Sequence, residues 1–265
     1  MNRQAESTLP ARFQLPGLGS FALLLLTVLA FVYSMQSVGL SPAQLLGGLP
    51  EIRRIVAEMF PPDLQRIDRI AAALLETFQM AFVGTALGIA GSFFLAVFAS
   101  RVHAPHRIIY FAARGLISLF RTVPDLVWAL LFVVAVGLGP FAGTLAIMVD
   151  TMGFCGRFFA EAMEEVQPGP QEALRAGGAR GADVIFCAVV PAALPSFVNS
   201  ALFSLEKATR SSVILGLVGA GGIGIELKVS MDLFQYNQAA TAILAIFALV
   251  IAVEQVSGAV RRRIL

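Results

Sequence analysis

The feature that most constrains the fold of this sequence is a series of long apolar runs with few or no charged residues. The first extends from Gly19 to about Met35, and others cover about residues 77–98, 141–159, 184–205 and 239–260. Crossing the hydrocarbon core of a bilayer takes roughly 20 apolar residues in a helix. A helix also satisfies its own backbone hydrogen bonds inside lipid. The runs therefore predict an all-α, polytopic transmembrane bundle.

Residues 108–138 leave two interpretations open. Residues 108–120 are apolar but carry Arg114, and the segment Arg121-Thr-Val-Pro-Asp125 interrupts the apolar sequence before residues 126–138. Either one helix kinks at Pro124, or a short surface helix precedes a span. Counting one span in this region gives about six spans in the chain.

The composition excludes several classes of protein. The set AVILMFWYC makes up 57% of the 265 residues and charged residues only 14%, whereas an ordinary soluble domain is about 25% charged. A soluble enzyme, a nucleic-acid-binding protein and a disordered chain are therefore poor interpretations. Cysteines 155 and 187 lack metal-site spacing, and histidines 103 and 106 lie in a short basic segment. We predict no metal site and no catalytic residue.

The region before the second span differs from the rest of the chain. Ile52, Ile55, Val56, Met59 and Phe60 recur at helical spacing on a charged segment that ends at residues 61–62, both proline. This pattern is typical of an amphipathic helix on a membrane surface. We therefore divide the chain into residues 1–70, with an N-terminal tail, a first transmembrane helix and a periplasmic amphipathic helix, and a core domain at residues 71–265. The core includes a cytoplasmic loop at residues 160–182.

The distribution of basic residues predicts the orientation. With the N-terminus inside, ten of the 19 basic residues fall on the inner side and seven on the outer side, while Arg114 and Arg121 remain unassigned. The inner group includes the arginine triplet at residues 261–263. The positive-inside rule therefore favours six spans with both termini in the cytoplasm.

The most informative polar segment is residues 171–191. Pro170 fits the first position of a helix, and Glu172 then lies in the first turn, where the helix dipole favours an anion. The glycine pair at 177–178 ends this helix, and a second helix begins near Asp183 and enters the membrane. The pattern predicts a short helix at the cytoplasmic face that docks into a groove on a partner. The alternative is an ordinary cytoplasmic loop with a turn at the glycine pair.

This segment resembles the cytoplasmic EAA loop of ABC-importer permeases. The family pattern is E-A-A, three residues, G, nine residues, I, one residue and L-P. The matching residues here are Glu172, Ala173, Leu174, Gly178, Ala188, Val190 and Pro191, of which Leu174, Ala188 and Val190 depart from the family residue. The resemblance implies that Glu172, Ala173, Leu174, Gly178 and Pro191 couple the permease to an ATP-hydrolysing subunit.

Further motifs narrow the resemblance to phosphonate-importer permeases, a group that includes permeases for phosphite and hypophosphite. They are Phe60-Pro-Pro-Asp63, Glu76-Thr-Phe-Gln-Met80 with Gly84-Thr85, Arg121-Thr-Val-Pro-Asp-Leu-Val-Trp-Ala129, Val136-Gly-Leu-Gly-Pro-Phe-Ala-Gly143 and Leu215-Gly-Leu-Val-Gly-Ala-Gly-Gly-Ile-Gly224. The resemblance implies a type I importer architecture in a bacterial inner membrane and transport of one of these phosphorus oxyanions. Permeases for another small solute, such as an amino acid, remain an alternative.

The resemblance also implies the partners. They are a second permease copy, a cytoplasmic ATPase dimer, and a periplasmic or lipid-anchored substrate-binding protein, all working at the lipid bilayer. The sequence has no Walker A pattern, so ATP and Mg²⁺ belong to the ATPase partner and this chain is not an enzyme on its own.

Polar residues at membrane depth are candidates for a translocation path. They are Arg121, Asp125, Lys207 and Arg210, together with the Gly-rich residues Gly219, Gly221, Gly222 and Gly224. Guanidinium groups suit an oxyanion, and Lys207 and Arg210 share one helical face. The alternative for each is structural pairing, such as Arg121 with Asp125 at i, i+4.

Two other classes of protein remain open at this point. The glycines 219–224 form a G-x-G-x-x-G pattern, but a nicotinamide-binding domain also needs a strand before it and a soluble βαβ unit. An ion-coupled secondary transporter would use Asp150 and Glu206 as ion or proton sites.

Overall fold

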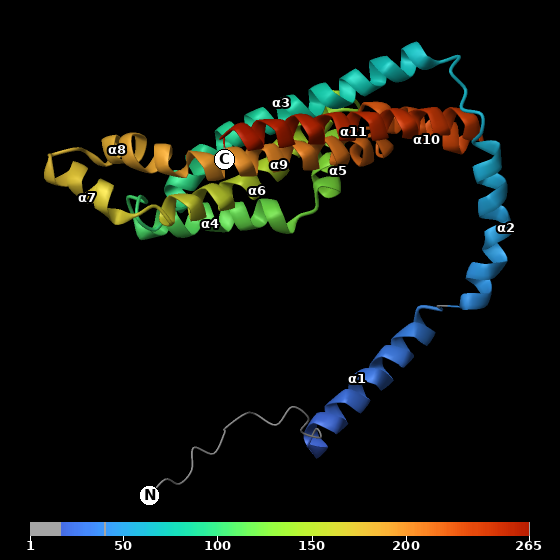
Figure 1. Ribbon diagram of the computed structural model, residues 1–265, viewed down its shortest axis with the longest axis horizontal. Helices are drawn as coiled ribbons and strands as arrows, with labels where there is room; N and C mark the ends of the chain where they lie inside the picture. The colour runs from blue at the N-terminus through green and yellow to red at the C-terminus, as the bar shows by residue number, and fades with distance from the viewer. Residues whose placement is uncertain (1–16, 40, 265) are drawn as a thin grey trace, which may run out of the picture. The chain divides into compact units, whose positions relative to one another are not determined.

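The computed structural model describes residues 17–39 and 41–264, and within them every regular element is a helix (Figure 1). The elements are α1 (Leu18–Ser37), α2 (Pro42–Glu58), α3 (Ile67–Ala99), α4 (Arg107–Thr122), α5 (Asp125–Val136), α6 (Pro140–Glu164), α7 (Pro168–Ala176), α8 (Gly181–Val184), the π-helical turn η1 (Ile185–Val189), α9 (Val190–Leu217), α10 (Ile223–Asp232) and α11 (Tyr236–Ile264). The predicted all-α class is confirmed.

The chain divides into two compact units, Met1–Arg54 and Ile55–Leu265. The division falls inside α2, whereas the sequence placed it at residue 70. In the first unit, α1 has no buried residue, and large apolar side chains such as Leu23 and Phe31 are exposed. This is the surface that a helix surrounded by lipid presents. The helix α2 begins ten residues before Ile52 and ends at Glu58, three residues before the proline pair.

Four helices are long and apolar enough to cross a membrane: α1, α3, the continuous helix over residues 181–217, and α11. The axes of α4 and α5 differ by 92°, and the pair gives a fifth span if the two helices are counted together as one. Neither helix alone is long enough, because 16 and 12 residues at about 1.5 Å each fall short of the bilayer core. The apolar sequence at residues 108–138 is interrupted near Pro124, as predicted: it forms two helices, and the chain bends between Thr122 and Asp125.

The remaining expected span, residues 141–159, corresponds to α6. This helix is not among those that are apolar enough by composition to cross a membrane. Its 25 residues lie at the centre of the second unit, packed against α3, α4, α5 and α9. Protein surrounds this helix on most sides, so it tolerates glycine, threonine and Asp150 where a lipid-facing helix does not.

The contact of α3 with α6 depends on small residues. A Cβ atom added to Gly84 would lie 2.8 Å from the carbonyl oxygen of Thr144, and one added to Gly88 would lie 2.8 Å from that of Met148. A third glycine, Gly91, meets Met152 in the same way. The glycines of α3 therefore permit its close approach to α6, as small residues commonly do between helices in lipid.

Candidate functional site

The exposed helix predicted after α6 is present as α7, which lies with α8 at one end of the second unit (Figure 1). Glu172 and Ala173 are exposed, Leu174 is half-buried, and Gln171 is buried with its amide 3.5 Å from the carbonyl oxygen of Val166. The helix therefore rests on the bundle through one face and presents Glu172 and Ala173 outward.

Two details of this segment differ from the prediction. The helix α7 begins at Pro168 with Gln167 as its N-cap, so Pro170 is the third residue and Glu172 lies beyond the first turn. Both prolines fit the first turn, because neither needs a backbone N–H there, and the sequence does not distinguish them. In addition, residues 160–164 belong to α6, so the loop begins later than residue 160.

The turn after α7 depends on Gly178, whose φ is +87°. The backbone N–H of Ala179 donates to the carbonyl oxygen of Leu174 at 3.0 Å, which closes the helix end. The chain then runs through α8 and η1 into α9, so the second helix begins at Gly181 rather than near Asp183. Pro191 is the second residue of α9, directly after the π-helical turn. The α7 end is thus joined to a continuous helix over residues 181–217.

The Gly-rich segment at residues 218–222 connects α9 to α10 and packs closely against α3 and α6. Added Cβ atoms would lie 2.7 Å from Pro140 Cα at Gly221 and 2.5 Å from Thr77 Oγ1 at Gly222. The backbone N–H of Gly139 donates to the carbonyl oxygen of Gly219 at 3.0 Å. Residues 213–217, which a dinucleotide-binding domain requires as a strand, belong to α9, so the inference from the sequence against a dinucleotide-binding domain at this G-x-G-x-x-G pattern is confirmed.

Two side chains of α3 hold this segment in place. Glu76 Oε1 accepts a hydrogen bond from the backbone N–H of Gly222 at 2.8 Å, and Thr77 Oγ1 accepts one from the N–H of Ile223 at 2.8 Å. Neither residue was assigned a role from the sequence. The carboxylate of Glu76 at the start of a charge-free apolar run does indicate that it needs a polar partner within the bundle.

The predicted path residues Lys207 and Arg210 have different surroundings. Lys207 Nζ donates to both carboxylate oxygens of Asp150 at 2.7 and 2.8 Å, joining α9 to α6. Its charge is therefore offset by a carboxylate and is not presented freely. Arg210 is exposed, and the structure gives its side chain no ion pair within the described residues. Glu206 pairs with Arg261 at 3.1 Å, so both carboxylates that an ion-coupled transporter would use are paired with bases.

Arg121 and Asp125 lie on either side of the bend between α4 and α5. Asp125 Oδ1 accepts the backbone N–H of Leu126 at 2.9 Å, and within the described residues no ion pair joins Asp125 to Arg121. Arg121 instead borders a cavity of about 330 Å³ between α4 and α6. The other lining residues are Arg114, Ile117, Ser118, Thr122, Arg157 and Glu161.

Two ion pairs lie at this cavity. Arg114 pairs with Glu164 at 3.0 Å, and Arg157 pairs with Glu161 at 2.7 Å. Arg121 has no such partner among the described residues, so the cavity carries one arginine charge in excess, beside two hydroxyl side chains. This combination suits a small oxyanion.

Comparison with known proteins agrees with this architecture. Residues 88–265 match the family described as binding-protein-dependent transport system inner membrane component. The chain is 40% identical over 226 residues to the phosphite transport system permease protein PtxC of Stutzerimonas stutzeri, covering 85% of this chain and 82% of that protein. It is 37% identical over 263 residues to the phosphate-import permease protein PhnE of Mycolicibacterium smegmatis, covering 96% of this chain and 46% of that protein.

Among solved structures, an inward-facing MetNI methionine ABC transporter superimposes with a TM-score of 0.63 at 23% identity, covering 74% of this chain and 96% of that chain. The fold is therefore the predicted one of an ABC type I importer permease. Together with the match over residues 88–265, this shows that the chain belongs to the family of binding-protein-dependent transport system inner membrane components.

Proposed function

We propose that this permease translocates phosphite, phosphonate or a related reduced phosphorus oxyanion across the bacterial inner membrane. The observation that carries the proposal is the similarity to a phosphite transport permease at 40% identity over 85% of this chain. The assembly contains two copies of this chain, a cytoplasmic ATPase dimer that binds ATP and Mg²⁺, and an external substrate-binding protein. Both termini and α7 face the cytoplasm, in keeping with the basic residues near those segments.

The geometry suggests how the ATPase acts on the path. The exposed residues Glu172 and Ala173 dock α7 on the ATPase, and the turn at Gly178 joins α7 to the continuous helix over residues 181–217. The far end of that helix touches α10, where a Cβ added to Gly216 would lie 2.7 Å from Gly224 Cα. A displacement of α7 is therefore transmitted along one helix to the Gly-rich segment. Movement of that segment opens the translocation path to one side of the membrane at a time.

Arg121 and Arg210 provide positive charge along the path. Both are exposed and neither has an ion-pair partner within the described residues. In a wet cavity each charge contributes on the order of 1 kcal/mol to the attraction of an anion. This favours entry without trapping the substrate, so specificity belongs to the external binding protein.

The test is uptake of labelled phosphite by the complete complex in proteoliposomes. We expect uptake that requires ATP and that excess phosphonate or hypophosphite inhibits more strongly than methionine. Uptake that continues with a hydrolysis-deficient ATPase would favour an ion-coupled transporter, and uptake of methionine in preference to phosphite would refute the substrate class.

A second test concerns the two arginines. We expect Arg121→Gln and Arg210→Gln each to slow uptake several-fold while the yield of intact complex is unchanged, with Arg→Lys partly tolerated. Arg53→Gln, an exposed arginine of α2, is the matched control. Loss of the folded complex in the Gln and Lys variants alike would show a structural role instead.

A further inference from the structure

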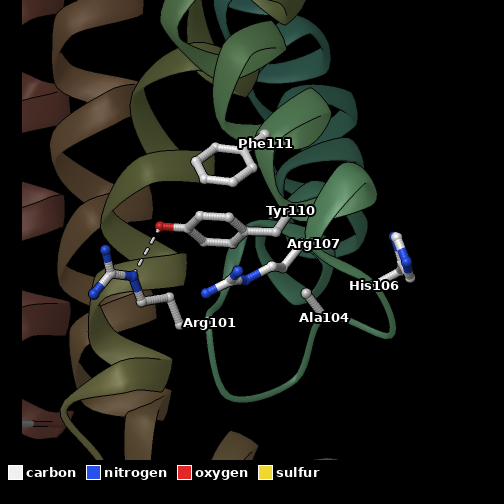
Figure 2. Close-up of a pocket in the computed structure, with 6 residues that line it drawn as sticks. All are labelled: Arg101, Ala104, His106, Arg107, Tyr110 and Phe111. Carbon is white, nitrogen blue, oxygen red and sulfur yellow. Dashed lines mark hydrogen bonds between the residues drawn. The ribbon is translucent and has the colours of Figure 1, made fainter.

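A second basic cavity, separate from the proposed path, lies where α3 is connected to α4. Its volume is about 390 Å³, and it is lined by Arg101, Ala104, His106, Arg107, Tyr110 and Phe111. Figure 2 shows the side chains of Arg101 and Arg107 extending beneath the Tyr110 ring, while His106 points away from them.

The connection that forms the cavity is held firmly. Ser100 Oγ lies 2.9 Å from His103 Nδ1, and the carbonyl oxygen of Ser100 accepts the backbone N–H of Ala104 at 2.9 Å. At the other end of the connection, His106 Nδ1 accepts the N–H of Ile108 and caps α4. The cavity is therefore a preformed feature of the fold.

The two arginines retain free donor groups. Arg101 Nε donates to the Tyr110 hydroxyl at 3.3 Å, which orients the guanidinium (Figure 2). Its two terminal nitrogens have no hydrogen bond or ion pair to the described part of the chain. Within residues 17–39 and 41–264, the structure gives the Arg107 side chain no hydrogen bond or ion pair. The nearby carboxylate of Glu164 already accepts from the Arg101 backbone N–H at 2.7 Å and from Arg114 at 3.0 Å. The described residues that line the cavity include two arginines and no acidic residue, so the cavity is positively charged.

The surroundings of the cavity are apolar. Ile108 is 72% exposed and Phe111 is 67% exposed on the first turns of α4, beside the cavity. In a membrane-embedded chain, exposed apolar residues of this size face acyl chains. Basic cavities at the cytoplasmic ends of transmembrane helices are suited to anionic lipid headgroups. A hydrated inorganic oxyanion would gain nothing from the apolar rim.

We propose that this cavity binds the phosphodiester headgroup of an anionic phospholipid. Arg101 and Arg107 hold the phosphate oxygens, the Tyr110 ring forms the wall, and the acyl chains lie along Ile108 and Phe111. The bound lipid fixes the connection between α3 and α4 at the membrane surface. This inference does not depend on the transported solute.

The experiment measures lipid retention by the full-length permease. The protein is purified from nanodiscs that contain equal parts of phosphatidylglycerol and phosphatidylcholine, washed with detergent, and analysed for bound lipid. We expect selective retention of phosphatidylglycerol. Each of Arg101→Gln and Arg107→Gln should lower retention of phosphatidylglycerol about fivefold, because that is the binding affinity that one basic residue contributes near an anionic surface. Tyr110→Phe should lower retention less.

The control variant is Arg262→Gln/Arg263→Gln, which removes two basic residues near the end of α11 outside the cavity and should leave retention unchanged. Equal loss in this control would show diffuse surface electrostatics and overturn the proposal. Equal retention of the two lipids would also overturn it. Displacement of phosphatidylglycerol by millimolar inorganic phosphate or phosphite would assign the cavity to a free oxyanion instead. Because Arg107 has no partner among the described residues, its variant tests the cavity even if Arg101→Gln misfolds.

Discussion

The two glycine-containing turns of the bundle, at residues 177–178 and 219–222, show two different reasons for the same residue type. The turn after α7 lies at one end of the second unit, and a Cβ added to Gly178 would meet nothing within 4 Å. The turn before α10 lies toward the other end (Figure 1), and there an added Cβ at Gly219, Gly221 or Gly222 would meet backbone or side-chain atoms of neighbouring elements. The first turn requires glycine for its backbone angle alone, and the second requires it for space as well.

This difference indicates how each turn works. A turn without neighbours is free to move with whatever docks on α7, at little cost to the rest of the bundle. A turn that contacts α3, α6 and α9 at once changes only when those helices shift relative to one another. In the proposed coupling mechanism, the α7 end is therefore the input, and the turn at residues 219–222 is part of the rigid response.

The largest effect is expected at Gly224, where α10 meets α9. A Cβ there would contact Val213 O and would lie 2.7 Å from Gly216 Cα, both backbone atoms that cannot turn aside. Overpacking of this kind costs about 1–3 kcal/mol, and more where the backbone must shift. Gly224→Ala should therefore reduce the yield of monodisperse protein in size-exclusion chromatography. Gly169→Ala, in the open on α7, is the control; equal yields would contradict the close packing of α10 against α9 directly after the second turn.

The next effect concerns the hydrogen bonds that hold the packed turn. Thr77→Val preserves shape but leaves the buried N–H of Ile223 without its acceptor, which costs about 1–3 kcal/mol. We expect a lower thermal midpoint for the purified protein. The control is Thr27→Val on α1, where the hydroxyl only donates to Leu23 O. An unchanged midpoint in Thr77→Val would show that the N–H finds another partner.

The sequence predicted the helices better than the contacts between them. Apolar runs and Gly178 mark helices and their ends through local chemistry, so α1 and α7 were expected near their observed positions. The span expected at residues 184–205 is longer than predicted, because the helix continues past its charged residues to Leu217. Pairings such as Glu76 with Gly222, 146 residues apart, or Lys207 with Asp150, 57 residues apart, depend on how the helices pack. The sequence shows that such charges need partners but not which partners they find, so Lys207 was left open between a charge on the path and a structural pair, and its partner Asp150 was not identified.

A smaller effect is expected at the open turn. Gly178 has φ of +87°, while its neighbour Gly177 has φ of −78°. An L-residue in the left-handed region costs roughly 1–2 kcal/mol. Gly178→Ala should leave membrane insertion and yield intact but weaken ATPase attachment in pull-down and lower ATP-driven uptake. Gly177→Ala should behave as the unaltered protein, because its Cβ would make only ordinary contact at 3.4 Å with Leu174 O. Equal loss in both variants would point to space rather than backbone angle.

The smallest effect is a pH dependence at the α7 end. Burial lowers the pKa of His103, in the connection between α3 and α4, and the positive charge of Arg175 on α7 lowers it further. The folded protein therefore holds His103 neutral at pH values where the unfolded chain, with a pKa near 6.5, takes up a proton. Stability from this group is present above about pH 6.5 and falls as the pH drops below it.

The thermal midpoint of the purified protein should decline between pH 7.5 and 5.5, and less steeply in His103→Gln. If His103→Gln and the unaltered protein decline in parallel, His103 is not the group responsible, and the α7 end has no contact there that responds to protons.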